Sequence, residues 1–356
     1  MKPIFSLLRI FVSLRMTVVS LLGLAVLIFW GTLVQKDVGI WGAQERFFQT
    51  WVVMAGGDGA SGGFPVMPGA RTWFALLIVN LTASMVVLAL KKRLGPGIAL
   101  VHGGLLIMLL SGAWTQWTAE ESFIDLIEGE STNVAIAYHD WDMVLWKVAD
   151  GDPEMHAIDI QGVVSNETFV FEPLGIQVEV ESYYRNSIAA ALVTNSVDRL
   201  PVQSPLGAGT LFRNTPEMEP SKNKPGILFT LSAEDAPLAR VILHADDAHA
   251  FRFSHEGEEW SLALRRKRFP LPFDLKLINF EEVQYENSQT AKEYSSVVEV
   301  SASGRTRQVK IEMNKPLRFE GYTLYQSRFA RLQNGMESSN LAVMRDSAEQ
   351  IPYWAT

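Results

Sequence analysis

Three long apolar runs dominate the first third of the chain. Residues 16–34 and 72–90 each contain 19 consecutive residues without Asp, Glu, Lys or Arg, and residues 97–117 contain 21. A bilayer core of about 30 Å is crossed by roughly 20 helical residues, so each run is long enough to span a membrane. The first run is too long for the apolar part of a signal peptide and lacks a small-x-small cleavage site. We therefore predict transmembrane helices at about 16–34, 72–90 and 97–117.

From about Ser122 onward, apolar and polar residues alternate in short segments, as in GIQVEVESY, GILFTLSA and YSSVVEVSA. Alternation with period two is typical of half-buried β-strands. Only residues 187–193 suggest a helix. We predict an α+β membrane protein with a membrane domain over residues 1–117 and a large β-rich domain over residues 118–356. Its sheets should be antiparallel and sandwich- or barrel-like, with residues 201–225 as the boundary if two sub-domains exist.

The distribution of charge predicts the orientation of the chain. Residues 1–117 contain nine Lys/Arg against three Asp/Glu, whereas residues 118–356 contain 22 against 36. The cations of the first part gather before the first run, at Lys2, Arg9 and Arg15, and in the short loop at Lys91, Lys92 and Arg93. By the positive-inside rule both segments are cytoplasmic. We predict an inner (cytoplasmic) membrane protein with a cytoplasmic N-terminus and a periplasmic large domain. Its acidity argues against a nucleic-acid partner.

One ionisable side chain lies inside the third run. His102 is surrounded by apolar residues and glycine in the segment IALVHGGLLIML. An ionisable residue within the bilayer marks a functional site by default, and neutral imidazole is a common metal ligand. Gly103 and Gly104 would let a helix or a flat ligand approach the backbone. The alternative is a histidine that only donates a hydrogen bond to a neighbouring helix, and the residue pattern favours neither.

Asn80 is the most polar residue of the second run, which also contains Thr82 and Ser84. Amides and hydroxyls within the membrane commonly join neighbouring helices by hydrogen bonds. We predict this role for them in preference to a transport path.

The β-rich part shows no familiar catalytic pattern. The chain has no cysteine, which excludes thiol chemistry and disulfides. His244, His249 and His255 cluster near Asp246 and Asp247, but their spacing matches no strong zinc pattern, so we expect solvated loop histidines, with a metal site as the alternative. The basic run at residues 265–268 is expected to be a solvated strand edge, or else to bind a lipid headgroup or a propionate. A binding or scaffolding module is predicted, not an enzyme.

Several motifs in the C-terminal third resemble those of a known family. Leu271, Pro272 and Phe273 form an L-P-F strand, and Tyr294 and Ser295 begin another. A third motif comprises Asn314, Lys315, Pro316, Leu317, Gly321, Tyr322, Tyr325, Gln326 and Ser327. In the N-terminal part, Gly31 and Thr32, the segment LIVNL at 77–81 and the pattern H-x-G-L-L from His102 also fit. Together these motifs resemble the ResB (CcsB) family of cytochrome c biogenesis proteins.

The resemblance implies a role in cytochrome c maturation. Family members work with a CcsA-type partner to move haem across the membrane and present it for covalent attachment to apocytochrome c. Here the resemblance implies that His102, flanked by Gly103 and Gly104, is one axial ligand of haem b. The chain would then be at most the non-catalytic subunit of a holocytochrome c synthase. The alternative is a membrane-anchored β scaffold that assembles a respiratory or envelope complex without haem.

One segment departs from the family pattern. Family members usually continue past a D-P-G…I-P-Y stretch into a fourth membrane helix. Here the corresponding segment, residues 345–356, reads RDSAEQIPYWAT. The expectation is that the fourth helix is lost or is supplied by a neighbouring chain.

Overall fold

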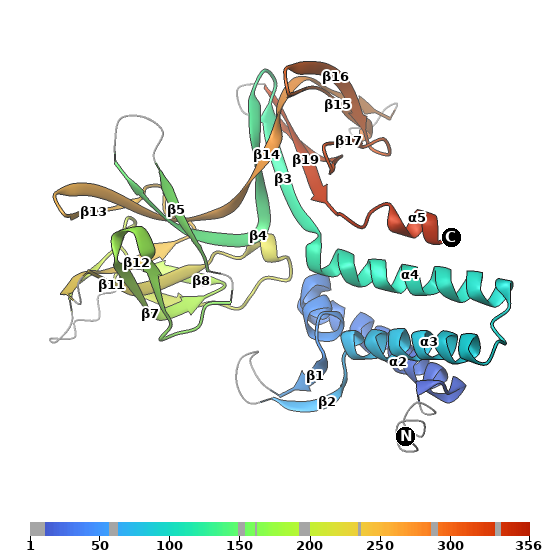
Figure 1. Ribbon diagram of the computed structural model, residues 1–356. Helices are drawn as coiled ribbons and strands as arrows, with labels where there is room; N and C mark the ends of the chain where they lie inside the picture. Colours follow the sequence, from blue (N-terminus) through green and yellow to red (C-terminus); the bar gives the residue numbers. More distant parts are fainter. Residues whose placement is uncertain are drawn as a thin grey trace. The chain divides into compact units, whose positions relative to one another are not determined.

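The computed structural model describes residues 11–56, 63–148, 154–160, 162–191, 200–233, 236–285, 291–331 and 336–356 (Figure 1). The chain divides into two compact units. The first comprises Met1–Glu120 with Arg345–Thr356, and the second comprises Glu121–Met344.

Three helices of the first unit are long and apolar enough to cross a membrane. They are α2 (Leu14–Ala43), α3 (Ala70–Leu90) and α4 (Pro96–Thr118). Ser13 caps α2 by accepting a hydrogen bond from the backbone N–H of Arg15. Pro96 stands in the first turn of α4, where a missing N–H costs nothing. The three predicted runs are confirmed as helices that could span a membrane.

The first helix extends beyond its predicted end at residue 34. It continues to Ala43, with an interruption at Gly39, whose φ of 74° lies in the left-handed region that favours glycine. A short π-helix, η1 (Gln44–Phe48), follows, and then the antiparallel strands β1 (Val52–Ala55) and β2 (Phe64–Pro68). Glycines on α2 make room for aromatic rings. A methyl group at Gly23 would collide with the indole of Trp73, and Gly31 faces the ring of Phe48.

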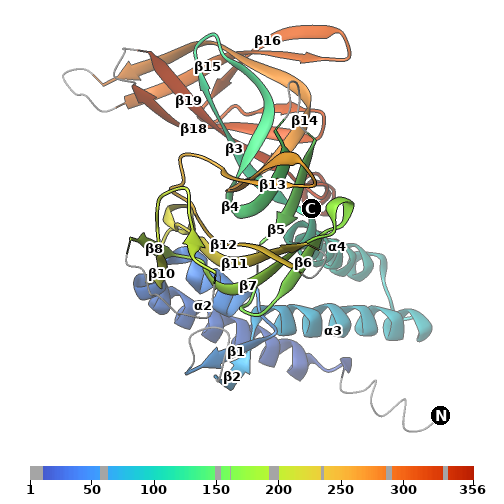
Figure 2. The ribbon, with the colours of Figure 1, turned by 90° about the vertical axis from the view of Figure 1, so that its left-hand side faces the viewer.

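The second unit is built almost entirely from β-strands. Its largest sheet contains β3 (Glu120–Ile127), β4 (Ser131–Lys147), β5 (Met155–Asp159), β13 (Phe251–His255), β14 (Glu258–Gln284), β15 (Ala291–Ala302), β16 (Arg305–Glu312), β17 (Leu317–Phe319), β18 (Tyr322–Arg331) and β19 (Glu337–Arg345). A second sheet contains β6 (Thr168–Phe171), β7 (Ile176–Tyr184), β9 (Val202–Gln203), β11 (Gly226–Ala233) and β12 (Ala236–His244). Figure 2 shows β6, β7, β11 and β12 together from the side. The short helical turns of this unit are η2 (Glu172–Leu174) and η3 (Pro220–Lys222), whereas the short helix α5 (Ile351–Ala355) belongs to the first unit.

The predicted antiparallel, β-rich architecture is confirmed. Among the strand pairs of the described residues, β9 with β12 is the parallel exception. The helix expected at residues 187–193 is wrong for its first four residues, which form β8 (Ser187–Ala190) paired with β10 (Thr210–Arg213). Pairing with a neighbouring strand overrides the weak helical preference of so short a segment.

Two hydrophobic cores share the two longest strands. In the first core, Met143 of β4 and Leu262 of β14 pack with residues of the five-stranded sheet such as Val178, Phe229 and Val241. In the second core, Ala135 of β4 and Leu275 of β14 pack with residues of β3 and β15–β19. Residues 201–225, the boundary expected if two sub-domains exist, contain β9, β10 and η3, and the division into sub-domains stays a prediction.

The second core lies in a sheet that approaches closure. β16 stands at one end of the strand order and β17 at the other, yet β16 contacts both β17 and β18. The seven longest strands of this part all contribute buried side chains to one interior. The expected barrel-like arrangement fits this part of the chain, and the sandwich-like arrangement fits the first core.

Two interruptions in the pairing of β4 with β14 bend both strands. Between Arg266 and Arg268 the partner on β4 jumps from Trp141 to Ile136, so that residues 137–140 bulge out. The guanidinium of Arg266 donates a hydrogen bond to the carbonyl oxygen of Tyr138 inside this bulge. A bulge re-aims the strand that carries it, which lets each long strand serve both cores.

Candidate functional site

His102 lies near the start of α4. The imidazole Nδ1 is 3.0 Å from the carbonyl oxygen of Ile98, one turn earlier in the same helix. A ring nitrogen at this distance from a carbonyl donates its proton, so in the neutral ring Nε2 is unprotonated and carries an outward lone pair. Within the described residues, no hydrogen bond to Nε2 is found. The hydrogen bond of His102 therefore stays within α4 and does not join a neighbouring helix.

This arrangement fits a metal-binding histidine. Such residues usually bind through one ring nitrogen while the other donates to a carbonyl or carboxylate, which fixes the tautomer and the orientation of the ring. His102 is followed at helical spacing by Leu106, Leu109 and Ala113, and all four are partly buried, in one stripe of α4. An apolar stripe suits the flat, apolar face of a porphyrin. The residues present therefore fit an axial ligand to haem iron.

The two glycines beside His102 have different surroundings. A methyl group at Gly103 would meet only the Met85 Cε atom, at 4.0 Å, which is an ordinary contact. A methyl group at Gly104 would collide with the carbonyl oxygen of Ala355 in α5. The close approach expected for this glycine pair is thus made at Gly104 by a helix of the chain itself.

Asn80 joins α3 to α2, as predicted. Its Oδ1 accepts a hydrogen bond of 2.7 Å from the Thr17 hydroxyl, and its Nδ2 donates to the carbonyl oxygens of Phe11 and Ser13. Asn80 is buried, so these bonds satisfy an amide that would be costly to leave unpaired away from water. The interhelical hydrogen bond predicted for this residue is confirmed.

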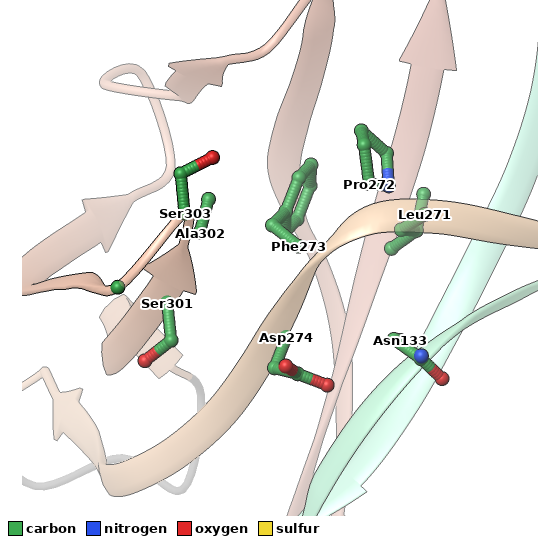
Figure 3. A pocket seen from close by; sticks show the side chains of 9 residues that line it. Asn133, Leu271, Pro272, Phe273, Asp274, Ser301, Ala302 and Ser303 are labelled. Atoms are coloured by element: carbon green, nitrogen blue, oxygen red, sulfur yellow. The ribbon is translucent and has the colours of Figure 1, made fainter.

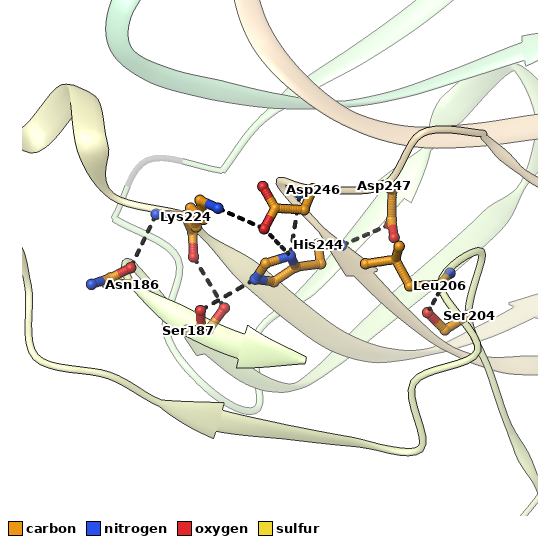
Figure 4. Close-up of polar contacts among 8 residues, drawn as sticks. All are labelled: Asn186, Ser187, Ser204, Leu206, Lys224, His244, Asp246 and Asp247. Atoms are coloured by element: carbon orange, nitrogen blue, oxygen red, sulfur yellow. Dashed lines mark hydrogen bonds and ion pairs between the residues drawn. The ribbon is translucent and has the colours of Figure 1, made fainter. Parts of the chain in front are cut away.

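His244 is a structural residue and not a solvated loop histidine. It lies at the end of β12 with 3% of its surface exposed. Its Nε2 is 3.2 Å from the carbonyl oxygen of Ser187, and its Nδ1 accepts a hydrogen bond from the backbone N–H of Asp246 (Figure 4). Asp247 in turn accepts from the backbone N–H of His244. The expectation of solvation was wrong here because the strand ends under the β8–β10 sheet, a contact that local sequence does not reveal.

The other members of this cluster do not join His244 in a metal site. His249 is exposed and His255 partly so. In the portions of the chain that the structure describes, no group of three or more His, Asp or Glu residues is placed to hold a metal ion.

The basic run at residues 265–268 is not a solvated edge over its first three residues. Arg266 is half-buried, lies 5.4 Å from the centre of the Trp141 ring and donates to the carbonyl oxygen of Ser221. The Lys267 Nζ pairs with Asp159 at 2.8 Å. The run lies beside the bulge of β4, between the two hydrophobic cores. There Arg266 and Lys267 interact with other groups of the β-rich unit.

Sequence reasoning missed the acidic groups that gather around Lys267. Asp142 of β4 pairs directly with Asp159 of β5. Asp140, two residues before Asp142 on β4, also lies close enough to interact with Asp159 and Lys267. Burial raises the pKa of the carboxyls of Asp140 and Asp142 above the ordinary value, and Lys267 opposes the rise. The D-x-D spacing on a strand was the available signal, because residues two apart on a strand point to the same face.

The L-P-F motif shapes a hollow on the β-rich unit. Residues 271–274 of β14 are opposed on β4 by Asn133 alone, so this part of β14 bulges. Leu271 and Phe273 are buried in the second core, while Pro272, which cannot donate to a sheet, occupies the bulge. The hollow has a volume of about 370 Å³, and Figure 3 shows Asp274 and Ser301 at its wall. The motif is thus explained by the fold.

Comparison with known families agrees with the motifs. Residues 244–353 match the model of the ResB-like family, from the end of β12 into α5. The match supports the assignment of the chain to ResB, a family that is associated with cytochrome c biogenesis. No curated protein matches the chain. His102 lies outside the matched residues, so its role stays a prediction.

Proposed function

We propose that this chain, whose ResB assignment the family match supports, takes part in cytochrome c maturation by holding haem in the membrane for delivery to apocytochrome c. Nε2 of His102 would be one axial ligand of the haem iron, and a CcsA-type partner would supply the other. The observation that carries this proposal is the hydrogen bond from Nδ1 to the Ile98 carbonyl, which leaves Nε2 available for a metal. Haem is the cargo in this proposal.

The residues of this chain would bind and orient haem without making its covalent bonds. The thioether bonds of a cytochrome c form between haem vinyl groups and cysteine thiols, and this chain contains no cysteine. The thiols would therefore belong to the apocytochrome. The apolar stripe beside His102 would exclude water from the iron, which favours a neutral imidazole as the ligand. The β-rich unit would hold the partner and the apocytochrome.

Membrane placement is part of the proposal. On α4, Leu100 is 78% exposed and Val101 is 68% exposed, and α2 and α3 expose similar apolar residues. Such surfaces are covered by lipid or by a partner helix. Since the chain has no cysteine, single cysteines report topology cleanly. In intact spheroplasts, Arg305→Cys should react with an impermeant maleimide, whereas Lys92→Cys should react only after lysis. The reverse pattern would refute the proposed orientation.

The proposal is tested by the absorption spectrum of the chain purified in mild detergent with its CcsA-type partner. We expect Soret and α bands in the unaltered complex, their loss in His102→Ala, and partial recovery with added imidazole. His249→Ala removes the same side chain from an exposed position and serves as the matched control, with unchanged haem content. Normal haem content in His102→Ala would refute the ligand role. A colourless unaltered complex would favour the membrane-anchored β scaffold.

A further inference from the structure

The segment that follows β19 returns to the first unit and lies along α4. Asp346 and Ser347 bind the C-terminal end of α4. The Thr115 hydroxyl donates to Asp346 Oδ2 at 2.9 Å, and the indole N–H of Trp114 donates to Ser347 Oγ at 2.8 Å. The Thr118 hydroxyl lies 3.2 Å from the same Ser347 oxygen. Side chains on two turns of α4 therefore hold the start of this segment.

The same segment contacts α4 again near its beginning. After a turn capped by Asp346, whose Oδ1 accepts from the backbone N–H of Ala348 at 2.8 Å, the chain forms α5. The carbonyl oxygen of Ala355, at the end of α5, packs against Gly104 of α4. Thr115 and Gly104 are 11 residues apart, which corresponds to roughly 16 Å along a helix. Residues 346–355, called the strap below, thus run antiparallel to α4 over much of its length (Figure 1).

The strap contacts the face of α4 that is opposite His102. Each residue of an α-helix advances by about 100°, so Gly104 lies roughly 200° from His102 around α4. By the same count Thr115 lies roughly 220° away and Thr118 roughly 160° away. Ser111, at roughly 180°, is buried on this face. Small and hydroxyl-bearing residues therefore form the strap side of α4, and His102 lies on the other side.

We propose that the strap positions His102 by fixing the rotation and height of α4. A helix with this much exposed apolar surface has few contacts of its own to set its rotation, since α4 buries only Ser111 fully among its residues. Contacts at both ends of one face supply that constraint. Gly104, Thr115 and Asp346 are then positioning residues, which act on His102 through α4. This role rests on the proposed function, because it gives the orientation of His102 its purpose.

Docking of the strap is tested without haem. Thr118→Cys and Ser347→Cys place two thiols where two hydroxyl oxygens lie 3.2 Å apart, in a chain that has no other cysteine. Mild oxidation of the purified full chain should give an intramolecular disulfide in most molecules, seen as a mobility shift that reductant reverses. Thr118→Cys paired with Lys92→Cys, which lies just before the other end of α4, is the control and should give no such band. Absence of the first disulfide would overturn the strap.

Positioning is tested with two glycines of α4. Gly104→Ala introduces a methyl group that collides with Ala355, whereas Gly112→Ala introduces the same methyl group, with the same gain in helix propensity, into open space. In the complex with the partner, Gly104→Ala should lower the affinity for haem by about tenfold or more, as overpacking of a close contact does. It should also change the low-spin electron paramagnetic resonance signal, which reports the orientation of the axial imidazole. Gly112→Ala should change neither.

A second pair of variants separates positioning from general damage. Thr115→Val removes the hydroxyl that donates to Asp346 without changing the shape of the side chain, and Thr115→Ser keeps that hydroxyl. We expect the altered spectrum in the valine variant and its recovery in the serine variant. Equal behaviour of Gly104→Ala and Gly112→Ala, or of the two Thr115 variants, would overturn the positioning role. Unaltered protein without haem would overturn the proposed function and this role with it, while the disulfide would still establish the docked strap.

Discussion

Gln326 offers the sharpest test of how the barrel-like part of the β-rich unit is held together. Its Oε1 accepts a hydrogen bond of 2.6 Å from the Ser296 hydroxyl, and its Nε2 donates to Ser339 Oγ at 3.0 Å. All three side chains are buried. Ser296 belongs to β15 and Gln326 to β18, which are not neighbours in the strand order. The amide therefore links two strands that no backbone ladder joins.

We expect Gln326→Leu to destabilise this part by about 2 kcal/mol. The two shortest of the hydrogen bonds of this amide, each worth roughly 1 kcal/mol net in a folded protein, dominate the loss. The hydroxyls of Ser296 and Ser339 lie 2.7 Å apart and can still bond to each other, which limits the further cost of unpaired buried groups. Leucine fills most of the volume of glutamine, so no large cavity adds to the loss. A change of about 2 kcal/mol corresponds to roughly 30-fold in an opening equilibrium.

Hydrogen exchange followed by mass spectrometry on the full chain in detergent measures this effect locally. Peptides from β15 and β18 should exchange roughly 30-fold faster in Gln326→Leu, while peptides from β7 and β11 in the other core keep their rates. Gln308→Leu makes the same chemical change at an exposed position of β16 and should alter exchange little. If Gln326→Leu behaves like Gln308→Leu, the network does not hold β15 to β18 and the reasoning fails.

Two further predictions concern charged groups of the β-rich unit. Glu181 accepts two hydrogen bonds of 2.6 Å from Arg240 across the five-stranded sheet, and both side chains are mostly buried. Arg240→Ala should lower the free energy of unfolding by about 3 kcal/mol, because it leaves the carboxylate buried without its cation. Urea denaturation should show that loss largely relieved in the double variant with Glu181→Gln, and no relief would contradict the pairing argument. Burial raises the pKa of the Asp142 carboxyl, so its contribution to stability is full below the ordinary aspartate pKa and is lost as pH rises through the raised value. Asp142→Asn should therefore be more stable than the unaltered chain at pH 7, with a difference that shrinks on acidification, and a difference independent of pH would contradict this assignment.

The membrane helices could be predicted because their signal is local. A run of about 20 uncharged residues is sufficient evidence for a helix that can cross a bilayer, whatever the rest of the chain does. The prediction placed the ends of α3 and α4 within two residues, but stopped α2 at residue 34. Lys36 and Asp37 ended the uncharged run there, although a helix that leaves the membrane can continue past charged residues.

In the β-rich unit, local sequence patterns predict the strands but not their lengths or their pairing. Alternation identified the strands, but it could not show that β14 runs from Glu258 to Gln284 through two cores. That length depends on the bulges opposite Lys267 and Asn133, and bulges are set by the register of the partner strand. For the same reason Arg266 looked like part of a solvated edge. Its position between two cores follows from strand pairing over more than one hundred residues of separation.

The candidate site divides in the same way. His102 was identified from its immediate sequence neighbours, because an ionisable side chain in a long apolar helix is unusual whatever the helix packs against. Gly104, two residues later, owes its role to Ala355, and no pattern near Gly104 indicates which chain segment would cover it. The spacing of Gly104, Ser111, Thr115 and Thr118 does contain a signal, since small and hydroxyl-bearing residues repeated at helical intervals are typical of helix contacts in membranes. His102 falls outside that stripe, and this separation would allow α4 to be held on one face and to bind the proposed haem on the other.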